Sequence, residues 1–197
     1  MRVSGLILAA GLSGRMNSFK PLLKIKNQTI IQVIIDKLLN VCDDVIIVTG
    51  FKSDEIKSVI EKSDRIKFVF NEEYEKGMFT SLKKGLSELS NSDWTIYHFV
   101  DQPFLPEIFY SDFVTRIDQN YNWIQPEFNS VKGHPILISR SIYQIILNES
   151  DGGSLRSISS NSFIKKFIWS CNYPQIHDDL DTPEEFKKLL LREGINL

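Results

Sequence analysis

A short segment near the start of the chain combines small residues with two cations. The apolar run 6–10 ends at Gly11, and Arg15 and Lys20 follow within ten residues of that glycine. Small residues let the backbone approach a polyanion closely, and the peptide N–H groups of such a loop form a concavity for phosphate oxygens. Arginine adds a planar fork of donors, and lysine adds a compact charge. The segment therefore predicts a phosphate-binding loop after a buried strand.

The spacing of this loop differs from that of two common phosphate-binding motifs. The Walker motif ends in Gly-Lys-Ser/Thr after four intervening residues, whereas Gly11 and Gly14 stand three apart and Arg15 follows. The dinucleotide motif Gly-x-Gly-x-x-Gly is also missing from the sequence. A plain glycine-rich turn after the first strand is the alternative interpretation.

Asp101 is the carboxylate best placed for chemistry. It follows the apolar and aromatic run 94–100, and Gln102 and Pro103 end that run. Mg²⁺ uses one or two carboxylates together with substrate phosphates, so an aspartate at the end of a strand suits this ion. An aspartate that caps the next helix would occupy the same position, and the position alone does not separate the two roles.

Two further residues are weaker candidates. His134 stands in a polar loop, where it would contact a substrate phosphate or transfer a proton; the sequence favours a histidine fixed by a backbone hydrogen bond. Asp181 precedes a helix that opens with Thr182, Pro183 and Glu185, a capping box with proline at the first helical position. Negative charge at this point also stabilises the helix dipole, so the position does not require Asp181 to face a site.

Strands and helices alternate along the first half of the chain. Continuous apolar runs of strand length are typical of strands buried on both faces. The predicted strands are 3–9, 45–48, 66–70 and 94–100, and the predicted helices are 29–39, 53–62 with Ser53 as its cap, and 80–89. This order favours a mostly parallel sheet with helices on both faces. The second half is less regular, with predicted helices 106–119 and 183–193 and short strands 123–125 and 136–138.

Ligands of such a sheet bind outside the carboxyl ends of its strands. The loop with Arg15 and Lys20, the segment 77–81 and Asp101 each follow one of the predicted strands. We therefore expect them to line one rim of the sheet.

The composition excludes several classes of protein. Lys and Arg number 23 against 25 Asp and Glu, so the net charge of −2 gives no basic surplus for nucleic acid. Neither a secretory leader nor a long apolar run occurs, and Cys42 and Cys171 lack metal-type spacing, so we expect a cytoplasmic protein with reduced thiols and no membrane segment. A chain of 197 residues with 42% hydrophobic content is expected to form a single domain, residues 1–197.

Seven short motifs carry a family resemblance. In chain order they are Leu8-Ala9-Ala10-Gly11-x-Ser13-x-Arg15-Met16, Lys20, Gly77-Met78-x-x-Ser81, Asp101-Gln102-Pro103, Gly133-His134-Pro135, Asp151-Gly152-Gly153 and Asp181-Thr182-Pro183-Glu184. Together they resemble the MobA-like nucleotidyltransferases, and within them the molybdenum cofactor cytidylyltransferase branch. The motifs run along nearly the whole chain.

The resemblance implies a fold and a set of site residues. The fold is a Rossmann-like three-layer αβα domain with a mostly parallel sheet, of the nucleotide-diphospho-sugar transferase type. The implied nucleotide-binding residues are Leu8, Ala9, Ala10, Gly11, Arg15, Lys20, Asn71, Gly77 and Ser81. The implied metal ligands for Mg²⁺ are Asp101 and Asp181, the implied catalytic residues are Arg15, Lys20 and Asp101, and the implied acceptor contacts are Gln102 and His134.

Two positions resemble the cytidylyl-transferring branch, and two depart from the family pattern. Ala10 replaces a glycine typical of the guanylyl-transferring branch, and Gln102 follows Asp101. Asn17 stands where glycine commonly follows Arg-Met, and Ser154 is inserted before the Leu-Arg pair that follows the glycines.

The resemblance also implies a reaction. A phosphate oxygen of molybdopterin attacks the α-phosphorus of CTP, pyrophosphate leaves, and the protein contributes positioning and charge neutralisation. A molybdenum hydroxylase would then receive the finished cofactor. Three alternatives stay open: GTP or ATP as the donor, a sugar or alditol phosphate as the acceptor, and a non-catalytic molybdenum-cofactor chaperone.

Overall fold

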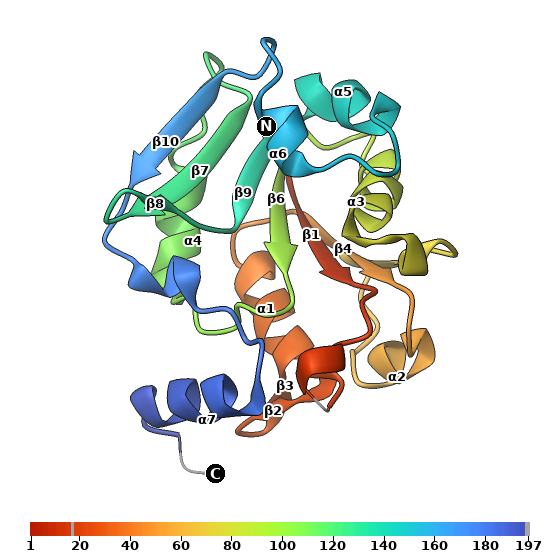
Figure 1. Ribbon diagram of the computed structural model, residues 1–197, viewed down its shortest axis with the longest axis vertical. Helices are drawn as coiled ribbons and strands as arrows, with labels where there is room; N and C mark the ends of the chain where they lie inside the picture. The colour runs from red at the N-terminus through yellow and green to blue at the C-terminus, as the bar shows by residue number, and fades with distance from the viewer. Residues whose placement is uncertain (17, 196–197) are drawn as a thin grey trace.

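A mostly parallel sheet forms the centre of the protein (Figure 1). The computed structural model describes residues 1–16 and 18–195, with the side chain of Arg15 excepted. Within these residues the main sheet has eight strands in the order β10-β7-β9-β6-β1-β4-β5, and β8 pairs with β7. The strands are β1 (Val3–Ala9), β4 (Asp44–Thr49), β5 (Ile66–Phe70), β6 (Trp94–Phe99), β7 (Trp123–Phe128), β8 (Val131–Lys132), β9 (Ile136–Ser139) and β10 (Lys166–Ser170).

The strands β6, β1, β4 and β5 run parallel to one another, as do β7 and β10. Strand β9 lies antiparallel between β6 and β7. A small separate hairpin pairs β2 (Lys24–Ile25) with β3 (Gln28–Thr29). The predicted α/β class with a mostly parallel sheet is confirmed.

Helices cover both faces of this sheet. The α-helices are α1 (Ile30–Leu39), α2 (Ser53–Ser58), α3 (Met78–Ser87), α4 (Glu107–Val114), α5 (Tyr143–Asn148), α6 (Leu155–Ser159) and α7 (Pro183–Arg192). The short 3-10 helices are η1 (Gly14–Met16), η2 (Lys20–Leu22), η3 (Tyr74–Lys76), η4 (Arg140–Ile142) and η5 (Pro174–His177). In the described residues, no helix combines the length and the hydropathy that a bilayer crossing needs.

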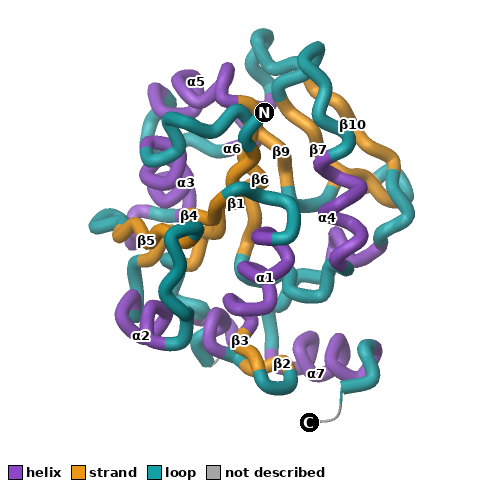
Figure 2. Tube along the Cα trace, turned by 180° about the vertical axis from the view of Figure 1, so that it is seen from behind, coloured by secondary structure: helices purple, strands orange, loops and turns teal. Residues whose placement is uncertain are grey.

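Each face of the sheet packs against its own set of helices (Figures 1 and 2). Helices α1, α2, α4 and α7 contribute side chains to one buried core, and α3, α5 and α6 contribute to the other. The side chains of β1 alternate between them, with Ile7 and Ala9 in the first core and Leu6 and Leu8 in the second. The continuous apolar run in this strand therefore reflects burial on both faces, as predicted.

Several element boundaries differ from the prediction. Ser53 does not cap α2: Lys52 stands at the cap position in a left-handed conformation, and Ser53 Oγ forms a buried 2.8 Å hydrogen bond with Thr49 Oγ1. Helix α2 ends at Ser58 and α4 ends at Val114, both earlier than predicted. The sequence analysis missed β10, α5 and α6, which are short and expose polar side chains, so their hydrophobic pattern is weak.

Candidate active site

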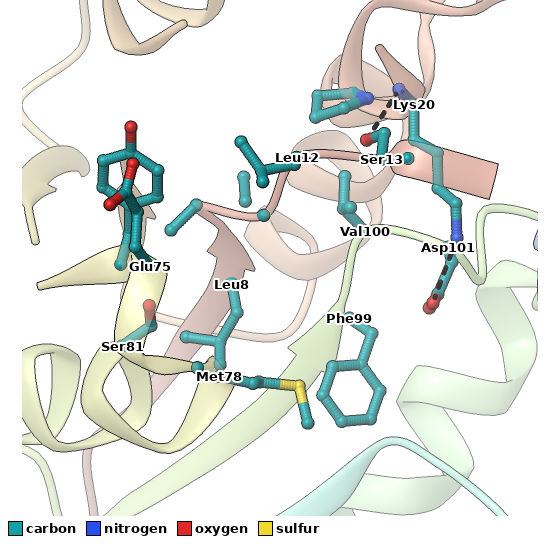
Figure 3. A pocket seen from close by; sticks show the side chains of 17 residues that line it. Leu8, Leu12, Ser13, Lys20, Glu75, Met78, Ser81, Phe99, Val100 and Asp101 are labelled. Carbon is teal, nitrogen blue, oxygen red and sulfur yellow. Dashed lines mark hydrogen bonds and ion pairs between the residues drawn. The ribbon is translucent and has the colours of Figure 1, made fainter. Parts of the chain in front are cut away.

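The carboxyl ends of β1 and β6 border a cavity of about 370 Å³ (Figure 3). The loop after β1, the start of η2, the 3-10 helix η3 and the N-terminus of α3 complete its wall. The lining residues are Leu8, Ala9, Ala10, Gly11, Leu12, Ser13, Gly14, Lys20, Pro21, Tyr74, Glu75, Gly77, Met78, Ser81, Phe99, Val100 and Asp101. Segments far apart in the sequence thus meet at one rim of the sheet, as the order of the strands predicts.

The loop after β1 is folded around Ser13 and leaves open space above its glycines. Ser13 has φ 54, and its Oγ accepts a 3.1 Å hydrogen bond from the Lys20 backbone N–H. A Cβ added at Gly11 or Gly14 would meet no described atom within 4 Å. The protein's own packing does not require glycine at either position, so the missing side chains keep the wall open for a ligand. Arg15 lies in η1, and its side chain lies outside the described residues.

Lys20 lies between two carboxylates from distant parts of the chain. Its Nζ is 3.0 Å from Asp181 Oδ1 and 3.8 Å from Asp101 Oδ2. The Leu180 N–H donates to the Asp101 carbonyl at 3.0 Å, which fixes the segment before α7 against the end of β6. The structure therefore brings Lys20, Asp101 and Asp181 together, as the resemblance implies.

The same segment is held by the predicted capping box of α7. Thr182 Oγ1 accepts from the Glu185 N–H, and Glu185 Oε2 accepts from the backbone N–H groups of Asp181 and Thr182. The capping box fixes the backbone of Asp181, and the Asp181 carboxylate contacts Lys20.

Asp101 is a desolvated carboxyl group in an acidic neighbourhood. Its pKa is raised to about 6, mainly by burial and to a smaller extent by the charges of Asp179 and Asp181, while the charge of Lys20 lowers it. Its Oδ1 atom is buried and has no hydrogen-bond partner among the described residues. Burying a carboxylate oxygen without a donor is costly, and a hard cation would offset that cost.

The N-terminus of α3 faces the same cavity without a side-chain cap. Gly77 stands at the cap position with φ 116, a conformation that glycine adopts without strain. Ser81 is 2% exposed and lines the cavity from the first turns of α3. The unpaired N–H groups of a helix N-terminus favour a polar or anionic ligand.

Asn71 supports this helix from behind. Its Nδ2 donates to Thr80 Oγ1 at 3.0 Å and to Ser81 Oγ at 2.9 Å, and its Oδ1 accepts from the Glu73 N–H. Asn71 is 3% exposed and is not among the residues that line the cavity. In this structure Asn71 positions Ser81, and its direct contact with a nucleoside stays a prediction.

Gln102 is also committed to internal contacts. It is 1% exposed, and its Nε2 donates to the Ile176 carbonyl at 3.0 Å and to Asp179 Oδ1 at 2.8 Å. Gln102 thereby joins the loop after β6 to the segment before α7. Asp179 accepts a hydrogen bond from the Gln102 amide, whereas Asp181 accepts one from Lys20. This geometry favours Asp181 over Asp179 as the carboxylate that faces the site, and acceptor binding by Gln102 stays a prediction.

His134 lies at a second cavity beside the first. Its ring centroid is 4.5 Å from that of Phe99, and its backbone N–H donates to the Ile176 carbonyl at 3.4 Å. Gly133 allows this contact, because a Cβ there would stand 2.7 Å from the Ile176 carbonyl oxygen. The backbone hydrogen bond that the sequence favoured is present, and the side chain also reaches a cavity.

The sequence analysis missed Lys37, which supports the loop that carries Asp101. Its Nζ donates to the Pro103 carbonyl at 2.6 Å and to the Leu105 carbonyl at 2.7 Å. Burial lowers the pKa of this ammonium. A lysine within an amphipathic helix carries no motif, so the contact emerges from the fold alone. Tyr74 and Phe99, which line the cavity, were also missed, because neither belongs to a recognisable motif.

We expect Lys37→Met to lower stability by about 1–3 kcal/mol, because two buried carbonyl groups lose a charged donor. Urea unfolding followed by circular dichroism measures this loss. Lys57→Met is the matched control, since Lys57 is an exposed lysine of α2 and its replacement should stay within about 0.5 kcal/mol. Equal midpoints for the two variants would contradict a supporting role for Lys37.

Comparisons with known proteins agree with this geometry. The family model of the MobA-like NTP transferase domain matches residues 5–165. The molybdenum cofactor cytidylyltransferase of Escherichia coli (strain K12) is 28% identical over 182 residues, which cover 92% of each chain.

Two solved structures share the fold. A nucleotidyl transferase from Methanothermobacter thermautotroptrophicus has a TM-score of 0.81 at 17% identity, covering 98% of this chain and 99% of that one. The complex of Rv0371c with manganese from Mycobacterium tuberculosis H37Rv has a TM-score of 0.77 at 17% identity, covering 97% and 99%.

The fold together with the family match defines the class of protein, an α/β nucleotidyltransferase. The chain belongs to the MobA-like NTP transferase family and is a nucleotidyltransferase. The family resemblance drawn from the seven motifs is thereby confirmed.

Proposed function

We propose that this enzyme transfers CMP from CTP to the phosphate of a molybdopterin-type acceptor in a Mg²⁺-dependent reaction. The observation that carries the proposal is the contact of Lys20 with both Asp101 and Asp181 at the edge of the first cavity. The name of the Escherichia coli relative supports cytidylyl transfer and a molybdenum-cofactor acceptor. The manganese complex among the structural neighbours supports a divalent metal.

The first cavity supplies the donor site. The base and ribose pack against Leu8 to Gly11 and the N-terminus of α3, and the triphosphate lies along the loop that ends at Lys20. Ala10 is 4% exposed and lines the cavity, so its methyl group takes space that a glycine would leave to a larger base. This supports a pyrimidine nucleotide.

The residues at the site suit Mg²⁺. Asp101 Oδ1 is a buried oxygen with no partner among the described residues, and Asp101 and Asp181 both lie within 4 Å of one ammonium group. Mg²⁺ commonly uses one or two carboxylates with substrate phosphates and waters, so Asp101 and Asp181 would suffice as its protein ligands. When bound, the ion neutralises phosphate charge and polarises the α-phosphoryl group.

The chain itself contributes positioning and charge. The acceptor oxygen forms a bond to the α-phosphorus, and the bond from the α-phosphorus to the bridging oxygen breaks, so the electron pair leaves with pyrophosphate. The Lys20 ammonium stabilises the charge on that leaving group. Asp101 and Asp181 would hold Mg²⁺ at the reacting end of the donor, and no protein nucleophile is needed.

Thermal stability with single nucleotides tests this proposal. We expect CTP with Mg²⁺ to raise the melting temperature, since a ligand at about 100 times its Kd stabilises the fold by about 2.7 kcal/mol. GTP, ATP and UTP with Mg²⁺, and CTP without it, should give smaller shifts. A shift with GTP alone would overturn the choice of base, and no shift with any nucleotide would overturn the donor site. Pyrophosphate release from CTP and molybdopterin then measures the transfer itself.

A further inference from the structure

A residue that follows β4 holds both ends of the loop after β1. The backbone N–H of Phe51 donates to the Ala10 carbonyl at 3.2 Å, one position beyond the strand pair Ala9 and Thr49. The Phe51 ring meets the ring of Phe19, with the centroids 5.6 Å apart and an interplanar angle of 84°. Ala10 precedes the loop and Phe19 ends it, so Phe51 fixes the separation of the two ends.

The contact with Phe19 bears directly on Lys20. Phe19 stands at the N-cap position of η2, where its carbonyl accepts from the Leu22 N–H at 3.0 Å, and its ring packs against the first core. Lys20 is the next residue, and its side chain extends from there to the Asp101 carboxylate (Figure 3). Because edge-to-face aromatic pairs add stability beyond their buried area, the pair of rings anchors the backbone from which Lys20 projects.

Lys52 joins the two rings to the start of α2. Its Nζ lies 5.8 Å from the ring centroid of Phe19 and 5.8 Å from that of Phe51, and it pairs with Glu55 Oε1 at 3.1 Å. A cation within about 6 Å of an aromatic face is attracted by the ring quadrupole. The cluster of two rings and one ammonium group therefore holds the end of the loop against the connection between β4 and α2.

Gly50 connects the same turn to the other end of the first cavity. A Cβ at Gly50 would stand 2.5 Å from Cγ of Tyr74, so a side chain there would displace the tyrosine. Tyr74 lines the cavity from η3, and Glu75 beside it lies across the cavity from Lys20 (Figure 3). The turn 50–52 and Phe19 are not among the lining residues. They support the walls of the donor cavity from outside it.

We propose that Phe51 is a positioning residue for the triphosphate: by holding Ala10 and Phe19, it sets the path of the loop between them and places the Lys20 ammonium at the phosphates. This inference rests on the proposed function, which assigns the loop to the triphosphate of CTP. A misplacement of about 1 Å in a group that acts on the transition state costs up to about 10²-fold in rate. A phenylalanine that only filled space would affect the melting temperature and leave the substrate constants unaltered.

Binding of inorganic tripolyphosphate in excess Mg²⁺, measured by isothermal titration calorimetry on the full chain, tests the positioning role. This probe carries the phosphates of the donor without base or ribose, so the result does not depend on the choice of nucleotide. We expect Phe51→Leu to weaken tripolyphosphate binding about fivefold, because the edge-to-face contact with Phe19 is lost. Phe51→Tyr keeps the ring and should bind within about twofold of the wild-type protein.

Phe167→Leu is the matched control for Phe51→Leu. Phe167 is also half-buried, and its ring centroid lies 5.3 Å from that of Tyr121. It belongs to β10, an edge strand of the sheet, and lies outside the cavity lining. We expect this variant to bind tripolyphosphate like the wild-type protein, even where its melting temperature falls as far as that of Phe51→Leu.

Transfer kinetics show whether Phe51 acts through Lys20. In the wild-type background, Phe51→Leu should raise the KM for CTP about fivefold and leave the KM for the acceptor unchanged. In the Lys20→Met background, the same substitution should change the KM for CTP by less than about twofold, because the group that Phe51 positions is no longer present. Two residues that act independently would give the same factor in both backgrounds.

Unaltered tripolyphosphate binding in Phe51→Leu, equal factors in the two backgrounds, or no tripolyphosphate binding by the wild-type protein would each overturn the positioning role. If the wild-type protein transfers CMP from CTP while Phe51→Leu behaves like Phe167→Leu, the proposed function stands and the role of Phe51 alone is rejected. If Phe51→Leu weakens tripolyphosphate binding and CTP supports no transfer, the role of Phe51 at the phosphates stands and the proposed function is rejected.

Discussion

Asp101→Asn is expected to lose nucleotidyl transfer by at least about 10²–10³-fold while the protein remains folded. Asn keeps the size of the side chain and removes the charge that the metal and the phosphates require. Pyrophosphate release under saturating CTP and Mg²⁺ measures the loss. Asp64→Asn, a change at an exposed aspartate away from the rim, is the control and should retain wild-type turnover.

The stability of the same variant separates a functional carboxylate from a structural one. Because burial raises the pKa of Asp101 to about 6, the folded protein binds the Asp101 proton more tightly than the unfolded chain does. Folding stability from this group is therefore highest at acidic pH and declines as the pH rises toward about 6. Above that pH, Asp101→Asn should melt at or above the wild-type temperature in metal-free buffer. A clearly lower melting temperature, or retained turnover, would contradict the metal assignment.

The buried strands of the sheet were the most predictable part of the fold. Leu6 and Ile7 belong to opposite cores, so an uninterrupted apolar run in β1 could only satisfy both faces of a covered sheet. The capping box at Thr182 and Glu185 was equally predictable from the sequence, because its hydrogen bonds join residues that are three positions apart. Local patterns of this kind do not depend on the rest of the chain.

The sequence predicted which strand ends meet at the rim of the sheet. It did not predict which side chains contact one another there. Lys20 and Asp181 are 161 positions apart, and the hydrogen bond between the Leu180 N–H and the Asp101 carbonyl that aligns them has no sequence signature. Asp179 and Asp181 both precede α7, and the fold distinguishes them: Asp179 accepts a hydrogen bond from Gln102, and Asp181 contacts Lys20. The family motifs predicted which segments meet at the rim, and tertiary packing assigned the individual contacts.

The lining of the second cavity could not be predicted from local sequence patterns either. Its wall combines Phe99 from β6, His134 from the turn before β9 and Arg156 from α6, three residues that share no spacing in the sequence. His134 looked like an ordinary loop histidine because nothing local indicates that strand β6 covers it. Burial, and with it the neutral state of the imidazole, is a property of the assembled layers.

Lys20→Met is expected to impair transfer by about 10²–10³-fold and to raise the KM for CTP, because the phosphates lose a fixed cation. The ligand-free protein adds a second consequence. Lys20 Nζ faces both Asp101 and Asp181, so removing it leaves two carboxylates in mutual repulsion. We therefore expect a lower melting temperature in metal-free buffer.

Mg²⁺ without nucleotide should restore part of that lost stability, and it should stabilise Lys20→Met more than the wild-type protein. The ammonium and the metal ion neutralise the same carboxylates and therefore compete. Each cation stabilises the folded protein more when the other is absent. A magnesium titration followed by thermal unfolding measures this difference. Lys24→Met, at an exposed lysine of β2 close by in the sequence, should respond like the wild-type protein. Equal magnesium responses for Lys20→Met and wild type would show that the ion binds elsewhere, and undiminished turnover would remove Lys20 from the mechanism.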